Sequence, residues 1–276
     1  MGRFSDRLRT GDVCVGLMAT IPHRTAIEVL GFVGLDFACI DQMFGPSDWN
    51  DVANMVRGAQ VFGLDPLVRI SAYPWVGAPD RRLAVDAARA FSLGATGVVF
   101  SSGQAIDVEQ VVHAAATWHK DVHIHPFSRD DYGQYSQKVS DDRYAIPLIE
   151  SEDGVRNIEE ILDVEGLKVL WLGLSDLSRV LGHPFDYEHP DVWRLIDRTV
   201  EKAHAKGIAI AGNVGYEFSK DIDAISGRVK RLRDHGIEII WLQNLGFLIQ
   251  WYLRDVISHV RDQPATDTVG VKRSAP

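Results

Sequence analysis

The feature that most constrains the fold of this chain is a regular alternation of short apolar runs with longer segments of helical periodicity. Runs that stay apolar on successive residues are typical of parallel strands buried on both faces, and each such strand needs a crossover to reach the next. Strands are predicted at 13–20, 37–41, 67–71, 97–101, 145–150, 169–174, 209–214 and 238–243. Helices are predicted at 24–33, 49–62, 81–93, 108–118, 154–162, 192–205, 221–235 and 247–260.

Eight strand and helix units favour a closed barrel over an open sheet. The 276 residues are close to the roughly 250 that an eight-fold barrel usually contains. The sequence holds neither a glycine-rich dinucleotide fingerprint nor a phosphate loop, the motifs that would favour an open doubly wound sheet. We therefore predict an α/β fold, a (β/α)8 TIM barrel, with one barrel domain over residues 1–262 and a polar tail over 263–276.

Glycine spacing supports these helix ends. Left-handed closing residues are preferred just after a helix, and glycines fall there at Gly34, Gly63, Gly94, Gly207 and Gly236. The longest predicted irregular stretch, residues 119–143, is too long for an ordinary connection and is expected to be functional or mobile.

Composition excludes several classes of partner. The 29 basic and 38 acidic residues give a net charge of −9, and the densest basic stretch, 228–233, is broken by apolar residues, so nucleic acid is not an expected partner. No apolar run is long enough to span a membrane, and the N-terminus lacks the apolar segment of a signal peptide. The two cysteines, Cys14 and Cys39, lie within apolar runs, which predicts reduced core residues and a cytoplasmic protein.

Acidic residues at the ends of two neighbouring predicted strands indicate a metal site. Glu150 closes the fifth strand, and Asp176 follows the sixth within Gly173-Leu174-Ser175-Asp176. The carboxyl ends of barrel strands meet at one rim, where active sites are built, and carboxylates there can hold a divalent cation. The ends of further strands place more polar residues at the same rim: Asp41, Arg69, Ser101, Asn213 and Gln243.

These rim charges also allow a purely structural role or a different carbonyl chemistry. Arg69 could simply neutralise Asp41 or Glu150 in a buried ion pair. Alternatively, carbonyl chemistry could use a Schiff base on a barrel lysine, but the lysine adjoining a strand, Lys168, is predicted at its beginning and therefore at the opposite rim. A metal-stabilised enolate is accordingly the preferred mechanism for a carbonyl substrate.

The chain resembles the HpcH/HpaI aldolase and citrate lyase family of metal-dependent pyruvate aldolases from about residue 11 to 260. The residues that carry the resemblance are Phe37-Ala38-Cys39-Ile40-Asp41, Pro66-Leu67-Val68-Arg69, Leu93-Gly94-Ala95-Thr96-Gly97, Ile149-Glu150-Ser151 and Gly173-Leu174-Ser175-Asp176-Leu177-Ser178. Their order and spacing make the resemblance more specific than any one of them alone.

The resemblance implies roles for these residues. Glu150 and Asp176 would bind Mg²⁺, Mn²⁺ or Co²⁺, and Arg69 would bind the keto oxygen of a 2-oxo acid such as pyruvate. The backbone of Gly173, Leu174 and Ser175 would receive the substrate carboxylate. It further implies a homo-oligomer, commonly a hexamer, in which the last helix packs on a neighbouring subunit, and the apolar residues 247–253 suit that contact.

The sequence departs from the family where proton transfer is expected. Family aldolases usually place Asp-Gly-Glu-His after the second strand, and that histidine takes part in proton transfer; this chain reads Asp41-Gln42-Met43-Phe44. Candidate replacements are His23, which follows the first strand, His123 and His125 in the long irregular stretch, or a metal-bound hydroxide. His123 and His125 could instead form a second metal site, because their spacing puts both on one side of an extended segment.

The expected function is therefore a metal-dependent carbon–carbon lyase of the aldolase type that acts on a 2-oxo acid through a metal-bound enolate. The missing histidine leaves open a related lyase or hydrolase that uses the same site, and a non-catalytic barrel with a binding role. Tyr73-Pro74-Trp75 could wall the pocket, Trp171 and Trp241 are expected to pack in the core, and the His-Pro pairs at 183–184 and 189–190 indicate loop and helix-start positions.

Overall fold

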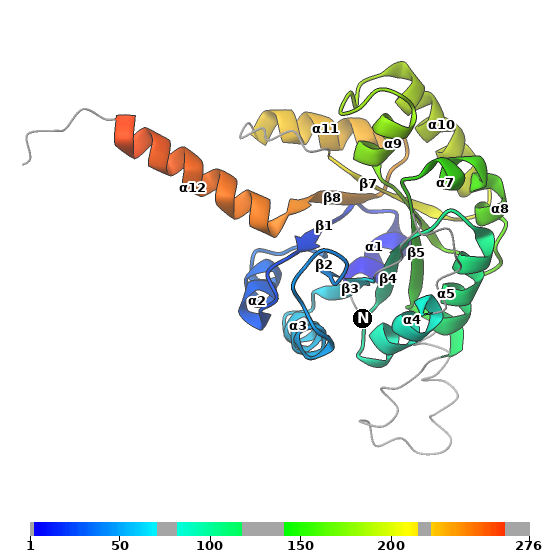
Figure 1. Cartoon of the computed structure of the whole chain (residues 1–276), viewed down its shortest axis with the longest axis horizontal. Coiled ribbons are helices and arrows are strands. Elements are labelled where there is room, and N and C mark those ends of the chain that lie inside the picture. The colour runs from blue at the N-terminus through cyan, green and yellow to red at the C-terminus, as the bar shows by residue number, and fades with distance from the viewer. Residues whose placement is uncertain (1–2, 71–81, 118–140, 215–221, 263–276) are drawn as a thin grey trace, which may run out of the picture.

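A computed structural model describes residues 3–70, 82–117, 141–214 and 222–262, and in these the eight strands close into a parallel barrel (Figure 1). Each strand pairs with the next along the chain, and β8 pairs with β1, so the predicted (β/α)8 TIM barrel is confirmed. The strands are β1 (Cys14–Ala19), β2 (Phe37–Asp41), β3 (Asp65–Arg69), β4 (Gly97–Ser101), β5 (Tyr144–Ile149), β6 (Val169–Leu172), β7 (Ala209–Asn213) and β8 (Ile239–Asn244).

Most of the helices surround the barrel (Figure 1). They are α1 (Arg3–Thr10), α2 (Arg24–Phe32), α3 (Trp49–Val61), α4 (Leu83–Ser92), α5 (Ala105–Thr117), α7 (Glu152–Arg156), α8 (Ile158–Leu162), α9 (Leu174–Val180), α10 (Pro190–His204), α11 (Ile222–Asp234) and α12 (Leu245–Asp262). Two of them, α1 and α9, were not predicted, and the segment predicted as one helix at 154–162 forms the short helices α7 and α8. The five helix-ending glycines all have positive φ, as expected for left-handed closing residues.

The apolar strands serve two cores. Their outward-facing side chains pack against the helices, while their inward-facing ones fill the barrel, as an alternation across each strand requires. Cys14 and Cys39 are fully buried inside the barrel as free thiols, which confirms their predicted core position. Helix α1 closes the amino-terminal end of the barrel, where Phe4 packs edge-on against Phe37 and Tyr144.

Lys168 and α12 occupy distinctive positions relative to the barrel. Lys168 donates to the Asp141 carbonyl at 2.9 Å, next to the start of β5, so it sits at the amino ends of the strands as predicted. Helix α12 projects away from the barrel (Figure 1), and none of its residues from 245 to 261 is buried. Among the helices of the described residues, none combines the length and hydropathy needed to cross a membrane.

Candidate active site

A cavity of about 540 Å³ opens at the carboxyl ends of the barrel strands. Parallel strands bring their last residues to this one rim, which is why side chains far apart in sequence meet there. The lining residues come from seven of the eight strands or the segments directly after them: Met18, Thr20, Asp41, Phe44, Arg69, Leu148, Glu150, Trp171, Gly173, Ser175, Asp176, Asn213, Trp241, Leu242, Gln243, Asn244, Gly246, Phe247 and Gln250.

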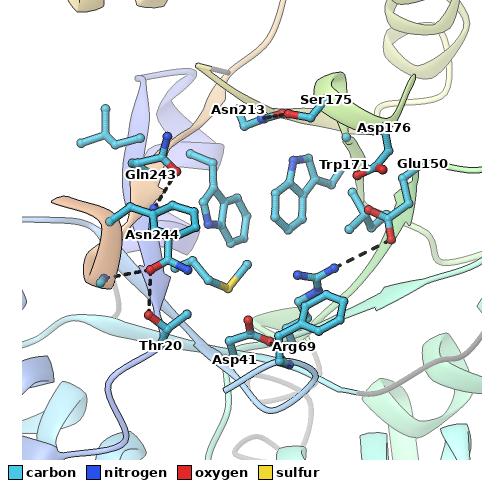
Figure 2. A pocket seen from close by; sticks show the side chains of 18 of the residues that line it. Thr20, Asp41, Arg69, Glu150, Trp171, Ser175, Asp176, Asn213, Gln243 and Asn244 are labelled. Atoms are coloured by element: carbon cyan, nitrogen blue, oxygen red, sulfur yellow. Dashed lines mark hydrogen bonds and ion pairs between the residues drawn. The ribbon is translucent and has the colours of Figure 1, made fainter. Parts of the chain in front are cut away.

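Glu150 and Asp176 lie side by side at one corner of the cavity (Figure 2). Glu150 directly follows β5 and is 6% exposed, whereas the Asp176 side chain is 42% exposed on the first turn of α9. Gly173 makes this approach possible, because a Cβ there would lie 3.1 Å from the Cβ of Glu150 and 3.1 Å from Leu148. The predicted acid pair is therefore brought together by a glycine between strand and helix.

The charge balance around Glu150 suits a cation. Burial raises the pKa of Glu150, and the neighbouring Asp176 charge raises it further; the Arg69 guanidinium and a hydrogen bond from the Ser101 hydroxyl oppose that rise. A divalent cation would favour the ionised form of both carboxylates, and carboxylate oxygens are the hard ligands such cations prefer. The donor set at this corner therefore fits a divalent metal.

Arg69 is only partly paired by Glu150. Its Nη2 lies 3.8 Å from Glu150 Oε1, an oxygen that also accepts from the Ser101 hydroxyl. Its buried Nε has no partner among the described residues. A bidentate pair would satisfy two arginine donors at shorter distances, so the ion pair does not use up the hydrogen-bonding capacity of the guanidinium.

Asp41 and Phe44 form the wall beside Arg69. Asp41 is 3% exposed, and its Oδ1 accepts the backbone N–H groups of Met43 at 3.0 Å and Phe44 at 3.3 Å. The Phe44 ring, 69% exposed, has the Arg69 guanidinium 5.1 Å from its centroid. An apolar ring thus covers one side of the arginine, at the position where the family pattern has a histidine.

Asn213 holds the segment after β6. Its Oδ1 accepts the backbone N–H of Leu174 at 3.1 Å, and its Nδ2 lies 3.4 Å from the Ser175 hydroxyl (Figure 2). The helix α9 begins at Leu174 with no side-chain cap from Gly173, so Asn213, on the next strand, satisfies its first backbone donor. This contact fixes the predicted carboxylate-binding segment of Gly173, Leu174 and Ser175.

The opposite side of the cavity is neutral and polar. Asn244 Oδ1 accepts from the Thr20 hydroxyl at 2.7 Å and from the Gly246 backbone N–H at 2.8 Å. Below them, Trp171 and Trp241 stack with ring centroids 3.9 Å apart and planes 7° apart. The two tryptophans are core residues as expected, but they also line the cavity, a role that their apolar sequence context did not indicate.

The structure does not bring every predicted residue to the cavity. His23 is exposed at the start of α2, where its Nδ1 accepts the Thr25 backbone N–H, and it is not among the lining residues. His123 and His125 lie outside the described residues, and so does the predicted wall at 73–75. The lining residues that the sequence did not reveal include Thr20, Asn244 and Gln250. The first two directly follow or end a strand, and that position is the signal that could have found them.

Known proteins resemble this chain over most of its length. A 2-keto-3-deoxy-L-rhamnonate aldolase from Escherichia coli is 28% identical over 225 residues, covering 75% of this chain and 76% of that protein. A crystal structure of an HpcH/HpaI aldolase from Desulfitobacterium hafniense covers 94% of this chain and 97% of its own, with a TM-score of 0.79 and 19% identity. The protein CitE of Mycobacterium tuberculosis, in complex with magnesium and pyruvate, covers 90% and 97% respectively, with a TM-score of 0.54 and 17% identity.

The family model for HpcH/HpaI aldolase/citrate lyase matches residues 53–244, which contain strands β3 to β8 and both acids of the candidate metal site. This match confirms the expected enzyme class, a carbon–carbon lyase of the aldolase type. Because the match covers well over half of the chain and agrees with the order of its motifs, this protein belongs to the HpcH/HpaI aldolase/citrate lyase family.

Proposed function

We propose that this protein makes or breaks a carbon–carbon bond next to the keto group of a 2-oxo acid such as pyruvate, with a divalent cation held by Glu150 and Asp176. The observation that carries the proposal is the convergence of these two carboxylates and Arg69 in one cavity at the strand ends. The aldolase activity in the name of the Escherichia coli relative and the magnesium and pyruvate bound by CitE support it.

Mg²⁺, Mn²⁺ and Co²⁺ are the proposed cations, because two carboxylates supply hard oxygen ligands that suit all three. When bound, such a cation supplies Lewis-acid polarisation of the 2-oxo acid. Ser101 would steady the arrangement, since its hydroxyl donates to Glu150 Oε1 and fixes the orientation of that carboxylate.

Arg69 would bind the keto oxygen and stabilise the negative charge that develops there. Its guanidinium already faces Glu150 at 3.8 Å, and its buried Nε has no described partner. A fixed, charged donor in a largely buried site stabilises developing charge with little reorganisation. The substrate carboxylate would be received at Gly173, Leu174 and Ser175, the segment that Asn213 holds.

Asp41 is the proposed proton acceptor. Among the described residues that line the cavity, it is the one carboxylate besides Glu150 and Asp176. Two backbone N–H groups bind its Oδ1, which holds the carboxylate in place beside Arg69 (Figure 2). Asp41 could take a proton directly or through one water, as general bases do. His23, His123 and His125 stay alternatives for this step.

A second candidate function follows from Phe44. An apolar, exposed ring over Arg69 cannot move a proton, so the same site could serve a related lyase or a hydrolase whose reaction needs no histidine at that position. A non-catalytic barrel that binds a 2-oxo acid is the remaining alternative. Proton exchange at the pyruvate methyl group separates the enolate-forming enzymes from the non-catalytic barrel, because it requires only enolate formation.

The test is exchange of the pyruvate methyl protons in deuterated water, followed by NMR with and without Mn²⁺. Metal-dependent exchange is expected in the wild type, with a loss of at least 100-fold in Glu150→Gln and Asp41→Asn, since a positioned base and a cation each contribute about 10²-fold or more. Glu152→Gln is the matched control: the same change in an exposed residue two positions away should leave exchange unaltered.

Phe44→His separates the alternatives. Exchange that is absent in the wild type and appears in Phe44→His would overturn the aldolase proposal, because the wild-type site would then lack its base. Exchange that persists in Asp41→Asn and falls in His23→Gln would move the proton-transfer role to His23. Exchange in all variants without metal would contradict the cation's role.

We also propose that the protein is a homo-oligomer, a hexamer by family resemblance, in which α12 packs on a second copy. Exposed apolar side chains at Ile249, Leu253, Val256 and Val260 follow helical spacing along one face of α12. Single exposed apolar residues are ordinary, but a contiguous stripe on a projecting helix marks an interaction surface. Leu253→Glu should yield a smaller species in light scattering, whereas Arg254→Glu on the same helix should not.

A further inference from the structure

Three donor residues outside the cavity converge at the junction of α9 and α10. His183 follows the end of α9, His189 caps the start of α10, and Asp191 lies in the first turn of that helix. One ligand atom from each lies within 4.8 Å of the other two. The distances from Asp191 Oδ2 are 3.0 Å to His183 Nε2 and 3.6 Å to His189 Nδ1.

The protonation pattern of this cluster leaves acceptors facing one another. His189 Nδ1 accepts the Asp191 backbone N–H at 3.2 Å, so this nitrogen carries a lone pair and no proton. Its 3.6 Å contact with Asp191 Oδ2 therefore joins two acceptors, with no hydrogen between them. The two imidazole rings stack with centroids 3.3 Å apart and planes at 16°, so their in-plane lone pairs run nearly parallel, and one ring has to turn for both nitrogens to point at one cation. A cation bound between His189 Nδ1 and Asp191 Oδ2 would remove the repulsion between these two acceptors.

The donors are also held in position. The Asp191 Oδ1 atom pairs with the Arg194 guanidinium, which leaves Oδ2 for a ligand, and second partners of this kind orient metal-binding carboxylates. The His183 backbone N–H donates to the Ser178 carbonyl at 2.8 Å. Phe185, with φ of 64°, makes the turn that returns the chain toward α10. The backbone next to His183 is therefore held by a hydrogen bond and by the turn at Phe185.

We propose that His183, His189 and Asp191 form a second metal site, for a transition-metal cation such as Zn²⁺. Zn²⁺ binds imidazole nitrogen and carboxylate oxygen at about 2.0–2.2 Å, so tetrahedral ligand atoms lie roughly 3.3 Å apart. The observed 3.0 and 3.6 Å bracket that separation. A cation bound at His189 Nδ1 replaces the hydrogen bond from the Asp191 backbone N–H, because an imidazole nitrogen has one lone pair. That backbone N–H then donates to water instead.

The ligand chemistry separates this site from the proposed catalytic one. Two imidazoles favour Zn²⁺, Cu²⁺, Ni²⁺ or Co²⁺, whereas the two carboxylates Glu150 and Asp176 suit Mg²⁺ and Mn²⁺. The two sites lie near opposite ends of one helix, since Asp176 is in the first turn of α9 and His183 lies three residues after its last residue, Val180. A cation at the second site would join the end of α9 to the start of α10 and so act as a structural clip on the helix that carries Asp176.

Metal binding to full-length protein without an affinity tag tests the site. Metal-free protein is saturated with Mg²⁺, which has little preference for imidazole, and then titrated with Zn²⁺ by calorimetry. One Zn²⁺ per chain is expected in the wild type, with at least a tenfold loss of affinity in His183→Gln and in Asp191→Asn. His113→Gln, which changes an exposed histidine on α5, is the matched control and should bind as the wild type does.

Two further readouts keep the test independent of folding and of catalysis. Co²⁺ should give a visible absorption band of nitrogen ligation in the wild type that is lost in His183→Gln, while the metal-free unfolding temperatures of the two proteins stay alike. Zn²⁺ should raise the wild-type unfolding temperature, since a ligand that binds the folded state stabilises it. Zn²⁺ affinity and stoichiometry that are unchanged in His183→Gln and Asp191→Asn would overturn the proposal and assign binding to other histidines.

Discussion

Replacing Asn213 by alanine should weaken binding of a 2-oxo acid without removing the cation site. The change deletes the acceptor of the Leu174 N–H, a bond of 3.1 Å, together with the weaker 3.4 Å contact to Ser175. A neutral hydrogen bond contributes about 1 kcal/mol net, and an unpartnered buried donor costs about 1–3 kcal/mol. Because the segment is next to the cavity and water can reach part of it, we expect about 1–2 kcal/mol, or roughly 5- to 30-fold in affinity.

The assay is calorimetric binding of oxalate, a planar anion of the same shape as the pyruvate enolate, in the presence of saturating Mn²⁺. Asn213→Asp separates positioning from charge. It keeps an oxygen acceptor for Leu174 but adds a negative charge beside the bound anion, so its loss of affinity should shrink as salt is raised. The loss in Asn213→Ala should be insensitive to salt, and Asn54→Ala, an exposed asparagine on α3, should bind oxalate normally.

Unaltered oxalate affinity in Asn213→Ala would refute the reasoning, because it would mean that the segment keeps its conformation without the hydrogen bond. Loss of Mn²⁺ binding in the same variant would also refute it. In that case Asn213 would act on Asp176 and the start of α9 as a whole, and not on the anion-binding segment.

Three further predictions concern stability and the acid pair. Phe4→Ala should lower the free energy of unfolding by about 3–5 kcal/mol, measured by urea denaturation, because the ring is fully buried at the end of the barrel. Burial raises the pKa of Asp65, against hydrogen bonds from Thr96 and the Phe4 backbone N–H, so its contribution to stability is present below the ordinary carboxyl value and is lost as pH rises through the folded value. Wild type should therefore lose stability relative to Asp65→Asn as pH is raised from about 4, and a difference that is constant with pH would contradict this. Ser101→Ala should weaken Mn²⁺ binding severalfold, since Glu150 loses the hydroxyl that orients it, while Ser151→Ala should affect only the start of α7.

The strands could be predicted because their signal is local. Continuous apolar runs identify all eight, and errors are confined to their ends. Strand β3 begins at Asp65, two residues before the predicted start, and therefore includes Pro66. A proline is tolerated there because it lies near the beginning of the strand, where its missing N–H is not needed for pairing. The predicted sixth strand extended to 174, whereas the structure begins α9 at Leu174, so Asp176 lies on a helix and not in a loop. An apolar leucine after a strand does not distinguish these two outcomes.

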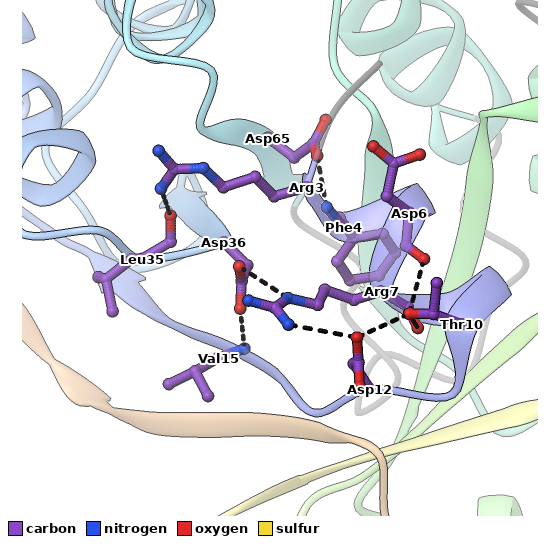
Figure 3. Close-up of polar contacts among 10 residues, drawn as sticks. All are labelled: Arg3, Phe4, Asp6, Arg7, Thr10, Asp12, Val15, Leu35, Asp36 and Asp65. Atoms are coloured by element: carbon purple, nitrogen blue, oxygen red, sulfur yellow. Dashed lines mark hydrogen bonds and ion pairs between the residues drawn. The ribbon is translucent and has the colours of Figure 1, made fainter.

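Helix α1 shows what a local pattern cannot provide. Four of its eight residues are charged, and its two large apolar side chains, Phe4 and Leu8, form too short a pattern to predict a helix. Its position depends on distant partners: the Phe4 backbone N–H donates to Asp65 at 2.7 Å, and Arg7 contacts Asp36 at 3.4 Å (Figure 3). Asp36 and Asp65 each directly precede or begin a strand, so they sit at the amino-terminal rim of the barrel. The helix is therefore specified by acids that the sequence separates from it by about 30 and 60 residues.

The candidate site likewise contains residues that the sequence pattern predicts and residues whose roles it does not predict. Glu150, Asp176, Arg69 and Asp41 could be predicted because each follows or ends a recognisable strand, and the structure places all four on one cavity. The roles of Ser101 and Asn213 could not be assigned, because both depend on hydrogen bonds to a neighbouring strand or its loop. The junction of His183, His189 and Asp191 is recognisable only once the turn between α9 and α10 has brought the residues together.

The floor of the cavity depends on Ala211, a small residue that has no reactive group to mark it in the sequence. Trp171 on β6 and Trp241 on β8 belong to strands separated by β7, yet their rings stack 3.9 Å apart. Ala211 on β7 lies in the same interior core, opposite Trp171 in register, and its methyl group leaves room for both indoles. A larger side chain at 211 would push the rings apart and change the floor on which a substrate rests. We therefore expect the side chains that fill the barrel under the cavity, and not only the polar groups at its rim, to influence which substrates fit.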